Sequence, residues 1–123
     1  MARFGELEAA IMDRVWAADG PVRVREVTEA LRADREIAYT TVQTVMEILH
    51  RKGWLSREKD GRAFRYSATA SPEEYTARLM SEALDDAPDR AASLLRFAEG
   101  LDEAEAAKLQ AALDAARGGR AAS

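Results

Sequence analysis

The chain has 123 residues, a net charge of −4, no cysteine and one histidine, His50. This excludes disulfides and thiolate metal sites, and it allows one domain or a small domain with an appendage. No stretch approaches the roughly 18 apolar residues of a membrane helix, and the N-terminus shows no signal peptide, so we expect a cytoplasmic protein without membrane insertion.

The chain contains a basic segment although its net charge is negative. Residues 1–70 carry 12 basic and 11 acidic side chains, whereas residues 71–123 carry 6 and 11. Residues 48–67 alone carry six basic and two acidic side chains. Because a local patch decides whether phosphate can dock, the acidic total does not exclude nucleic-acid binding by this segment.

Apolar residues at spacings of three and four predict a first helix over residues 6–17 and a second over residues 24–33. Asp19-Gly20-Pro21 between them is a turn signal, followed by a short extended piece at Val22-Arg23. The second helix lacks a favourable N-cap, because Arg23 stands where Ser, Thr or Asp is preferred.

A third helix is predicted over residues 38–52, and Gly53 supplies the left-handed residue that ends it. A basic β-hairpin follows, with strands over residues 54–58 and 63–68 joined by a turn that contains Asp60-Gly61. Three helices and a hairpin are the plan of a winged helix-turn-helix.

The remaining chain predicts three more helices. The first opens with a capping box at Ser71-Pro72-Glu73-Glu74, and the last ends at Gly118-Gly119. Helix capping explains the acidic residues Asp86 and Asp89, so no metal site is predicted. The fold class is therefore mostly α with a small β-hairpin.

Three short helices with few large apolar residues cannot form a stable core alone, so we expect them to complete a core with a second copy of the chain. This gives two domains, a winged helix over residues 1–70 and a helical dimerisation domain over residues 71–123. The residues predicted to lie in the dimer contact are Leu79, Leu84, Leu94, Leu95, Phe97, Leu109 and Leu113.

The start of the third helix is polar, which is typical of a helix that reads the major groove. Gln43 can form a bidentate pair with adenine, and threonine methyl groups can pack on thymine methyl groups. Basic side chains of the following wing suit phosphate or minor-groove contact. The candidate DNA-binding residues are Tyr39, Thr40, Thr41, Gln43, Thr44, Arg51, Lys59, Arg62 and Arg65.

These features also have plain structural interpretations. The polar helix start fits a solvated face with a threonine cap, and the wing charges fit an edge that prevents sheet aggregation. Tyr39 suits packing and phosphate contact equally. Phe64 and Tyr66 are more simply core residues than stacking platforms, Trp16 and Trp54 are packing residues, and His50 is a surface residue.

The chain offers no nucleophile–base constellation, so we expect neither an enzyme nor a cofactor. The leading hypothesis is a DNA-binding regulator. One alternative is a winged-helix protein-interaction module without an operator, and another is a ligand-sensing winged-helix regulator, which needs a pocket.

Five stretches of the chain together match a pattern of known proteins, namely residues 7–16, 24–27, 38–46, 52–55 and 61–66. On these stretches the chain resembles the BlaI/MecI/CopY family of bacterial repressors, over nearly its full length. The resemblance implies a homodimeric repressor that binds palindromic operators with TACA/TGTA half-sites and controls β-lactamase or related genes. It also implies that Thr40, Thr41, Gln43 and Thr44 lie in the recognition helix and Arg65 in the wing.

The resemblance further implies derepression by a membrane sensor and protease system that cleaves an Asn-Phe pair in the dimerisation domain. The matching pair here, and thus the candidate cleavage site, is Arg96-Phe97, in which arginine replaces the asparagine. The copper-responsive branch carries a C-terminal Cys-x-Cys motif, which this cysteine-free chain excludes.

Overall fold

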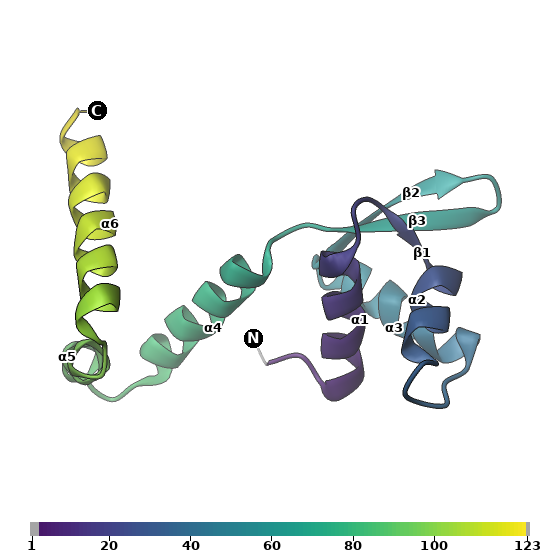
Figure 1. Ribbon diagram of the computed structural model, residues 1–123, viewed down its shortest axis with the longest axis horizontal. Coiled ribbons are helices and arrows are strands. Elements are labelled where there is room, and N and C mark those ends of the chain that lie inside the picture. The colour runs from purple at the N-terminus through teal and green to yellow at the C-terminus, as the bar shows by residue number, and fades with distance from the viewer. Residues whose placement is uncertain (1–2, 123) are drawn as a thin grey trace. The chain divides into compact units, whose positions relative to one another are not determined.

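A computed structural model of the chain describes residues 3–122, with side chains to residue 119. The predicted mostly helical fold with a small hairpin is confirmed, and the chain divides into two compact units between Leu79 and Met80. The elements in chain order are α1 (Glu6–Ala17), β1 (Val22–Arg23), α2 (Val24–Leu31), α3 (Tyr39–Arg51), β2 (Leu55–Asp60), β3 (Ala63–Ala68), α4 (Pro72–Asp86), α5 (Arg90–Glu99) and α6 (Glu103–Ala122) (Figure 1).

The core of the first unit lies between α1, α2, α3 and the sheet. Each helix contributes residues spaced three or four apart, as the amphipathic patterns predict. Complete burial of one such apolar side chain stabilises a fold by about 1.5–3 kcal/mol, so this cluster holds the unit together. Its fully buried large side chains are Ile11, Met12, Val27, Val42, Met46, Leu49, Leu55 and Tyr66.

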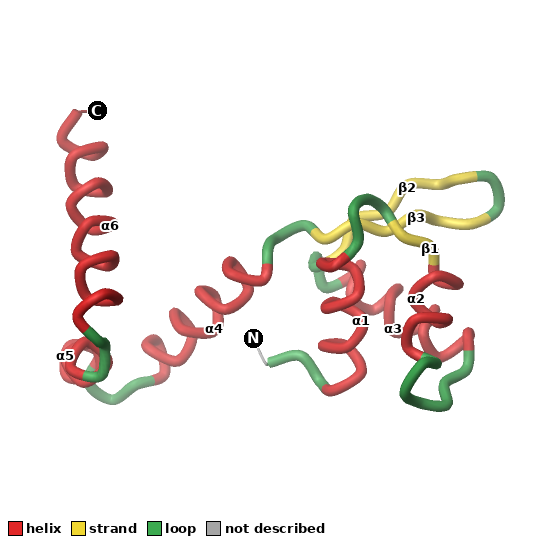
Figure 2. Tube along the Cα trace, in the orientation of Figure 1, coloured by secondary structure: helices red, strands yellow, loops and turns green. Residues whose placement is uncertain are grey.

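The hairpin is part of a three-stranded antiparallel sheet in the order β1-β3-β2 (Figure 2). The two residues of β1 pair with β3, Val22 opposite Tyr66 and Arg23 opposite Arg65. Tyr66 is buried, as predicted, and Phe64 is partly buried against the core. The pairing fixes the wing to the start of α2.

Two glycines have the backbone conformation that the sequence predicts. Gly53 ends α3 with a φ of +88°, and Gly61 turns the hairpin with a φ of +66°. Asp60, however, closes β2 opposite Ala63, so the loop itself is Gly61 and Arg62. A side chain with a Cβ atom is strained at positive φ, which explains glycine at both positions.

Helix ends follow local polar signals. Arg23 is the N-cap of α2 and makes no side-chain cap, as predicted, but Glu26 accepts its backbone N–H at 3.0 Å. The predicted capping box opens α4, where the Glu74 N–H donates to Ser71 Oγ at 3.1 Å. Asp89 caps α5 by accepting the Ala92 N–H at 3.0 Å.

Three expectations were wrong. Gly118-Gly119 does not end α6, which continues to Ala122, because neither glycine adopts the positive φ that stops a helix. Asp86 is the last residue of α4 rather than a cap. His50 is half-buried rather than on the surface, since its Nδ1 lies 3.0 Å from the carbonyl oxygen of Leu55.

An aromatic cluster packs the start of α4 against the rest of the first unit. Phe4 stacks on Tyr75 with ring centroids 4.1 Å apart, and Trp54 meets both rings edge-on. The Phe4 N–H donates to Tyr75 Oη at 2.7 Å, and Trp16 Nε1 donates to the Ala70 carbonyl at 2.8 Å. Trp16 and Trp54 are therefore packing residues, as predicted.

Candidate nucleic-acid interface

The buried side of α3 decides which residues face outwards. Val42, Met46 and Leu49 are fully buried, and this turns Thr40, Thr41 and Thr44 to the surface while Gln43 is half-buried. The N-cap of α3 is Ala38, without a side-chain hydrogen bond, so the threonine-cap interpretation is wrong. Within residues 3–119 these threonine hydroxyls and the Gln43 amide form no hydrogen bond, which leaves them available to a partner.

A hollow of about 290 Å³ lies between α3, the start of α2 and the hairpin. Tyr39 and Gln43 line it from α3, and Tyr39 is 42% exposed. Arg62 lines it from the wing, so the structure brings together three predicted site residues from two elements.

Sequence reasoning missed three charged residues of this hollow, Arg23, Arg25 and Glu47. Glu47 lies one helical turn after Gln43, a spacing that could have indicated it. The two arginines belong to β1 and α2, and only the pairing of β1 with β3 brings this part of the chain to the wing.

The six basic residues of the segment 48–67 differ in their partners. Lys52 Nζ donates to Glu8 Oε2 at 2.9 Å, and the guanidinium of Arg57 lies 4.1 Å from the centroid of the Phe64 ring. Three predicted DNA-binding residues are exposed and form no ion pair within residues 3–119, namely Arg51, Lys59 and Arg62.

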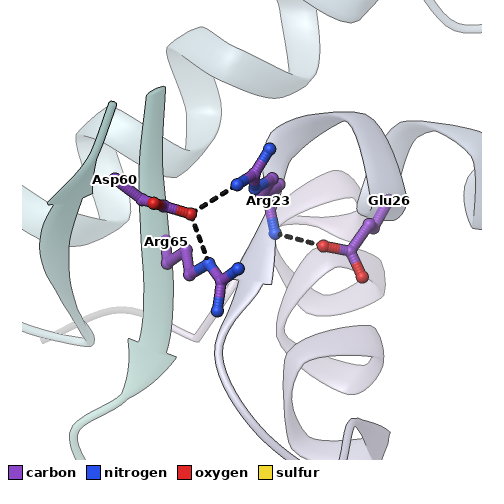
Figure 3. A network of polar contacts seen from close by, with 4 residues as sticks. All are labelled: Arg23, Glu26, Asp60 and Arg65. Atoms are coloured by element: carbon purple, nitrogen blue, oxygen red, sulfur yellow. Dashed lines mark hydrogen bonds and ion pairs between the residues drawn. The ribbon is translucent and has the colours of Figure 1, made fainter. Parts of the chain in front are cut away.

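The sixth, Arg65, is held by Asp60 within a small ionic network (Figure 3). Arg65 Nε donates to Asp60 Oδ2 at 2.7 Å, and Nη2 of Arg23 donates to the same oxygen. The hydrogen bond from Arg23 and the positive charges of Arg65 and Arg23 hold the pKa of Asp60 below its ordinary value. An ionised carboxylate thus bridges Arg65 to Arg23, and of these residues Arg23 lines the hollow.

The second unit presents an apolar groove of about 550 Å³. Five predicted contact residues line it together, and Met80, Ala83 and Ala98, which were not predicted there, complete the lining. Leu95 is exposed but lies outside this lining, and so does Leu79. The predicted residues in the groove are Leu84, Leu94, Phe97, Leu109 and Leu113.

The candidate cleavage pair lies within α5. Phe97 lines the apolar groove, whereas the Arg96 side chain is 85% exposed, with Nη1 3.6 Å from Oε2 of Glu99. The peptide bond between the two residues is part of a regular helix.

In the part of the chain that the structure describes, no group of three or more His, Asp or Glu side chains is arranged to hold a metal ion. None of the described helices combines the length and apolarity that crossing a membrane requires.

Comparison with known proteins identifies the family. The profile of the penicillinase repressor family matches residues 4–115. The transcriptional regulator BlaI of Mycobacterium tuberculosis is 43% identical over 126 aligned positions, which cover 98% of this chain and 91% of that protein.

Two solved structures are similar to the N-terminal part of the chain. The DNA-binding domain of the repressor BlaI is 26% identical with a TM-score of 0.53, covering 59% of this chain and 88% of that one. Monomeric BlaI of Bacillus licheniformis in complex with the blaP half-operator is also 26% identical, with a TM-score of 0.50, covering 60% of this chain and 89% of that one.

Proposed function

Because this chain belongs to the penicillinase repressor family of DNA-binding transcriptional repressors, which are not enzymes, we propose that it acts as a homodimer on a palindromic operator. Each subunit places the start of α3 in a major groove, and the two half-sites lie about 34 Å or a multiple of this apart. The proposed target is a TACA/TGTA palindrome near β-lactamase or related genes, and the proposed location is the cytoplasm.

One observation carries the proposal: the side chains of the three threonines and Gln43 at the start of α3 form no hydrogen bond within residues 3–119, and they adjoin a basic wing. Gln43 reads adenine through its amide, while the threonines at positions 40, 41 and 44 contact thymine methyl groups or phosphate. Phosphate contacts from Tyr39 and the wing position the helix. The half-operator complex of the Bacillus licheniformis relative supports double-stranded DNA as the partner.

The apolar groove supports a second copy of the chain as the other partner. A groove lined almost entirely by apolar side chains is costly to leave in water, and contiguous patches of this kind mark interaction sites. Residues 71–123 then form the dimerisation domain and residues 1–70 the DNA-binding domain. Phe97 and Leu109 both line the groove and belong to the proposed contact.

Release from the operator is proposed to follow cleavage at Arg96-Phe97 by a protease that a membrane sensor controls. Because this bond lies within α5, cleavage requires local unwinding of the helix. Phe97 also lines the groove, so cleavage beside it removes a dimer contact as well as cutting the chain.

A gel-shift titration tests the proposal. The purified protein is titrated against a TACA/TGTA palindrome and against a scrambled duplex of the same composition, and footprinting locates the protected bases. Preferred binding of the palindrome with two protected half-sites supports the proposal. Equal binding of both duplexes excludes the operator, and no binding at low ionic strength favours the protein-interaction alternative.

A further inference from the structure

The ionic network of Asp60 suggests a role beyond holding the wing in place. An arginine guanidinium recognises carboxylate and phosphate by the same planar fork of N–H donors. Asp60 accepts hydrogen bonds from two such forks with one oxygen, and the side chains of Arg23, Asp60 and Arg65 are 36%, 40% and 51% exposed. Both arginines therefore remain accessible to a phosphate group that replaces the carboxylate.

We propose that Asp60 is an internal substitute for a DNA phosphate, which occupies Arg23 and Arg65 until the operator is bound. This inference rests on the proposed function. In the free protein the carboxylate neutralises part of the charge of the two arginines. On the operator, phosphate groups accept hydrogen bonds from both guanidiniums, and Asp60 then has neither arginine as a partner.

The exchange favours specific over non-specific binding. Freeing the two arginines leaves a carboxylate near the phosphate backbone, and the resulting repulsion must be offset by other contacts. Gln43 lines the same hollow as Arg23, so base contacts by the amide form beside one of the two arginines, whereas Arg65 lines a separate hollow with Glu58. On a non-cognate duplex these base contacts are absent and Asp60 keeps both arginines.

The hairpin provides a matched control for the charge of Asp60. Glu58 lies directly opposite Arg65 in the pairing of β2 with β3, two residues from Asp60. Among the described residues, however, Glu58 forms no ion pair. Asp60→Asn and Glu58→Gln therefore remove the same charge from the same hairpin, but only the first frees the two arginines.

The experiment measures the affinity of wild type and both variants for the palindrome and the scrambled duplex across a series of salt concentrations. The salt dependence is the slope of the logarithm of the affinity against the logarithm of the salt concentration. For Asp60→Asn we expect this slope on the scrambled duplex to be steeper by about one to two units, since each additional phosphate contact adds about 0.9. A change of one unit corresponds to about three- to four-fold in affinity over a four-fold range of salt. Binding to the palindrome changes less, because the arginines are already free there.

Several results would overturn the proposal. If Asp60→Asn and Glu58→Gln change the affinities and their salt dependence equally, Asp60 acts only through the net charge of the hairpin. Weaker binding of both duplexes at unchanged slope makes Asp60 a structural support of the wing. A wild type that binds both duplexes equally refutes the proposed operator itself, which distinguishes that failure from failure of this inference.

A measurement on the unsubstituted protein makes the test independent of variant folding. The Nε–H signal of Arg65 is followed by nuclear magnetic resonance in arginine-labelled protein. We expect it to shift on the palindrome and to stay near its free position on the scrambled duplex. A shift of the same size on both duplexes contradicts the proposal.

Discussion

Tyr75 joins α4 to the first unit through two separable interactions, and this allows a graded test. Its hydroxyl oxygen accepts the Phe4 N–H at 2.7 Å, and its ring stacks on Phe4 at 4.1 Å. Tyr75→Phe removes only the hydrogen bond, whereas Tyr75→Ala removes the ring as well. We expect both variants to fold and to lose stability in that order.

The magnitudes follow from the contacts. A single hydrogen bond contributes about 1 kcal/mol, which is the expected loss for Tyr75→Phe. Truncation of a fully buried aromatic residue to alanine costs about 3–5 kcal/mol. Tyr75 is half-buried, so about half of this applies to its ring, and together with the hydrogen bond Tyr75→Ala should cost about 2.5–3.5 kcal/mol.

The assay is urea unfolding followed by tryptophan fluorescence. Both tryptophans of the chain, Trp16 and Trp54, belong to the cluster that Tyr75 completes, so the signal reports on the site directly. Tyr39→Ala is the control, because Tyr39 lies outside this cluster and is 42% exposed. A Tyr75→Ala variant that is as stable as Tyr75→Phe would refute the reasoning, since the stacked ring would then contribute nothing.

Three further predictions concern other parts of the molecule. Gln43→Ala should weaken operator binding by about 1–3 kcal/mol per half-site, about 5- to 150-fold, and relax one base position in titrations of substituted operators; an equal loss on every sequence would contradict base readout. Leu109→Asp combined with Leu113→Asp should give monomers in sedimentation, because two carboxylates enter the apolar groove; retained dimers would exclude the groove as the contact. Burial raises the pKa of Glu8, but hydrogen bonds from Lys52 and the Gly5 N–H and the charge of Lys52 outweigh it, so the pKa lies below 4.5. Its contribution, about 1 kcal/mol or less, is present above pH 4.5 and is lost as the pH falls through the folded pKa; Glu8→Gln should reduce the loss of stability between pH 7 and pH 3 in urea titrations, and an unchanged loss would argue against this role.

Much of the fold could be predicted because its signals are local. The spacing of apolar residues placed α1 at Glu6–Ala17, and Gly53 marked the end of α3. The polar run from Thr40 to Thr44 could be assigned to the outer face of α3, since a helical period fixes which residues share a face. The aspartates were harder to assign, because a short acidic side chain suits a cap, a turn and a strand end equally.

The candidate site could be predicted only in part. Tyr39 and Gln43 of α3 and Arg62 of the wing were predicted as site residues, because each belongs to a recognisable local pattern, whereas Glu47 of α3 was missed. Arg23 and Arg25 were missed there, and Met80 was missed in the apolar groove. The repeat of apolar residues along a helix or strand shows which face a residue occupies. It does not show which residue from another element lies opposite.

By itself, the sequence determined the helices, the hairpin and the residues that α3 exposes, since hydrophobic period, caps and turn glycines act over a few residues. Only the tertiary structure decided that Asp60 binds both Arg65 and Arg23, which lies 37 positions before Asp60. It also decided that Phe4 contacts Tyr75, which lies 71 positions after Phe4. Such contacts depend on how separate elements pack, and packing places side chains together that no local pattern relates. The partners of the wing arginines, and with them the charge that the wing offers to DNA, are therefore a property of the fold.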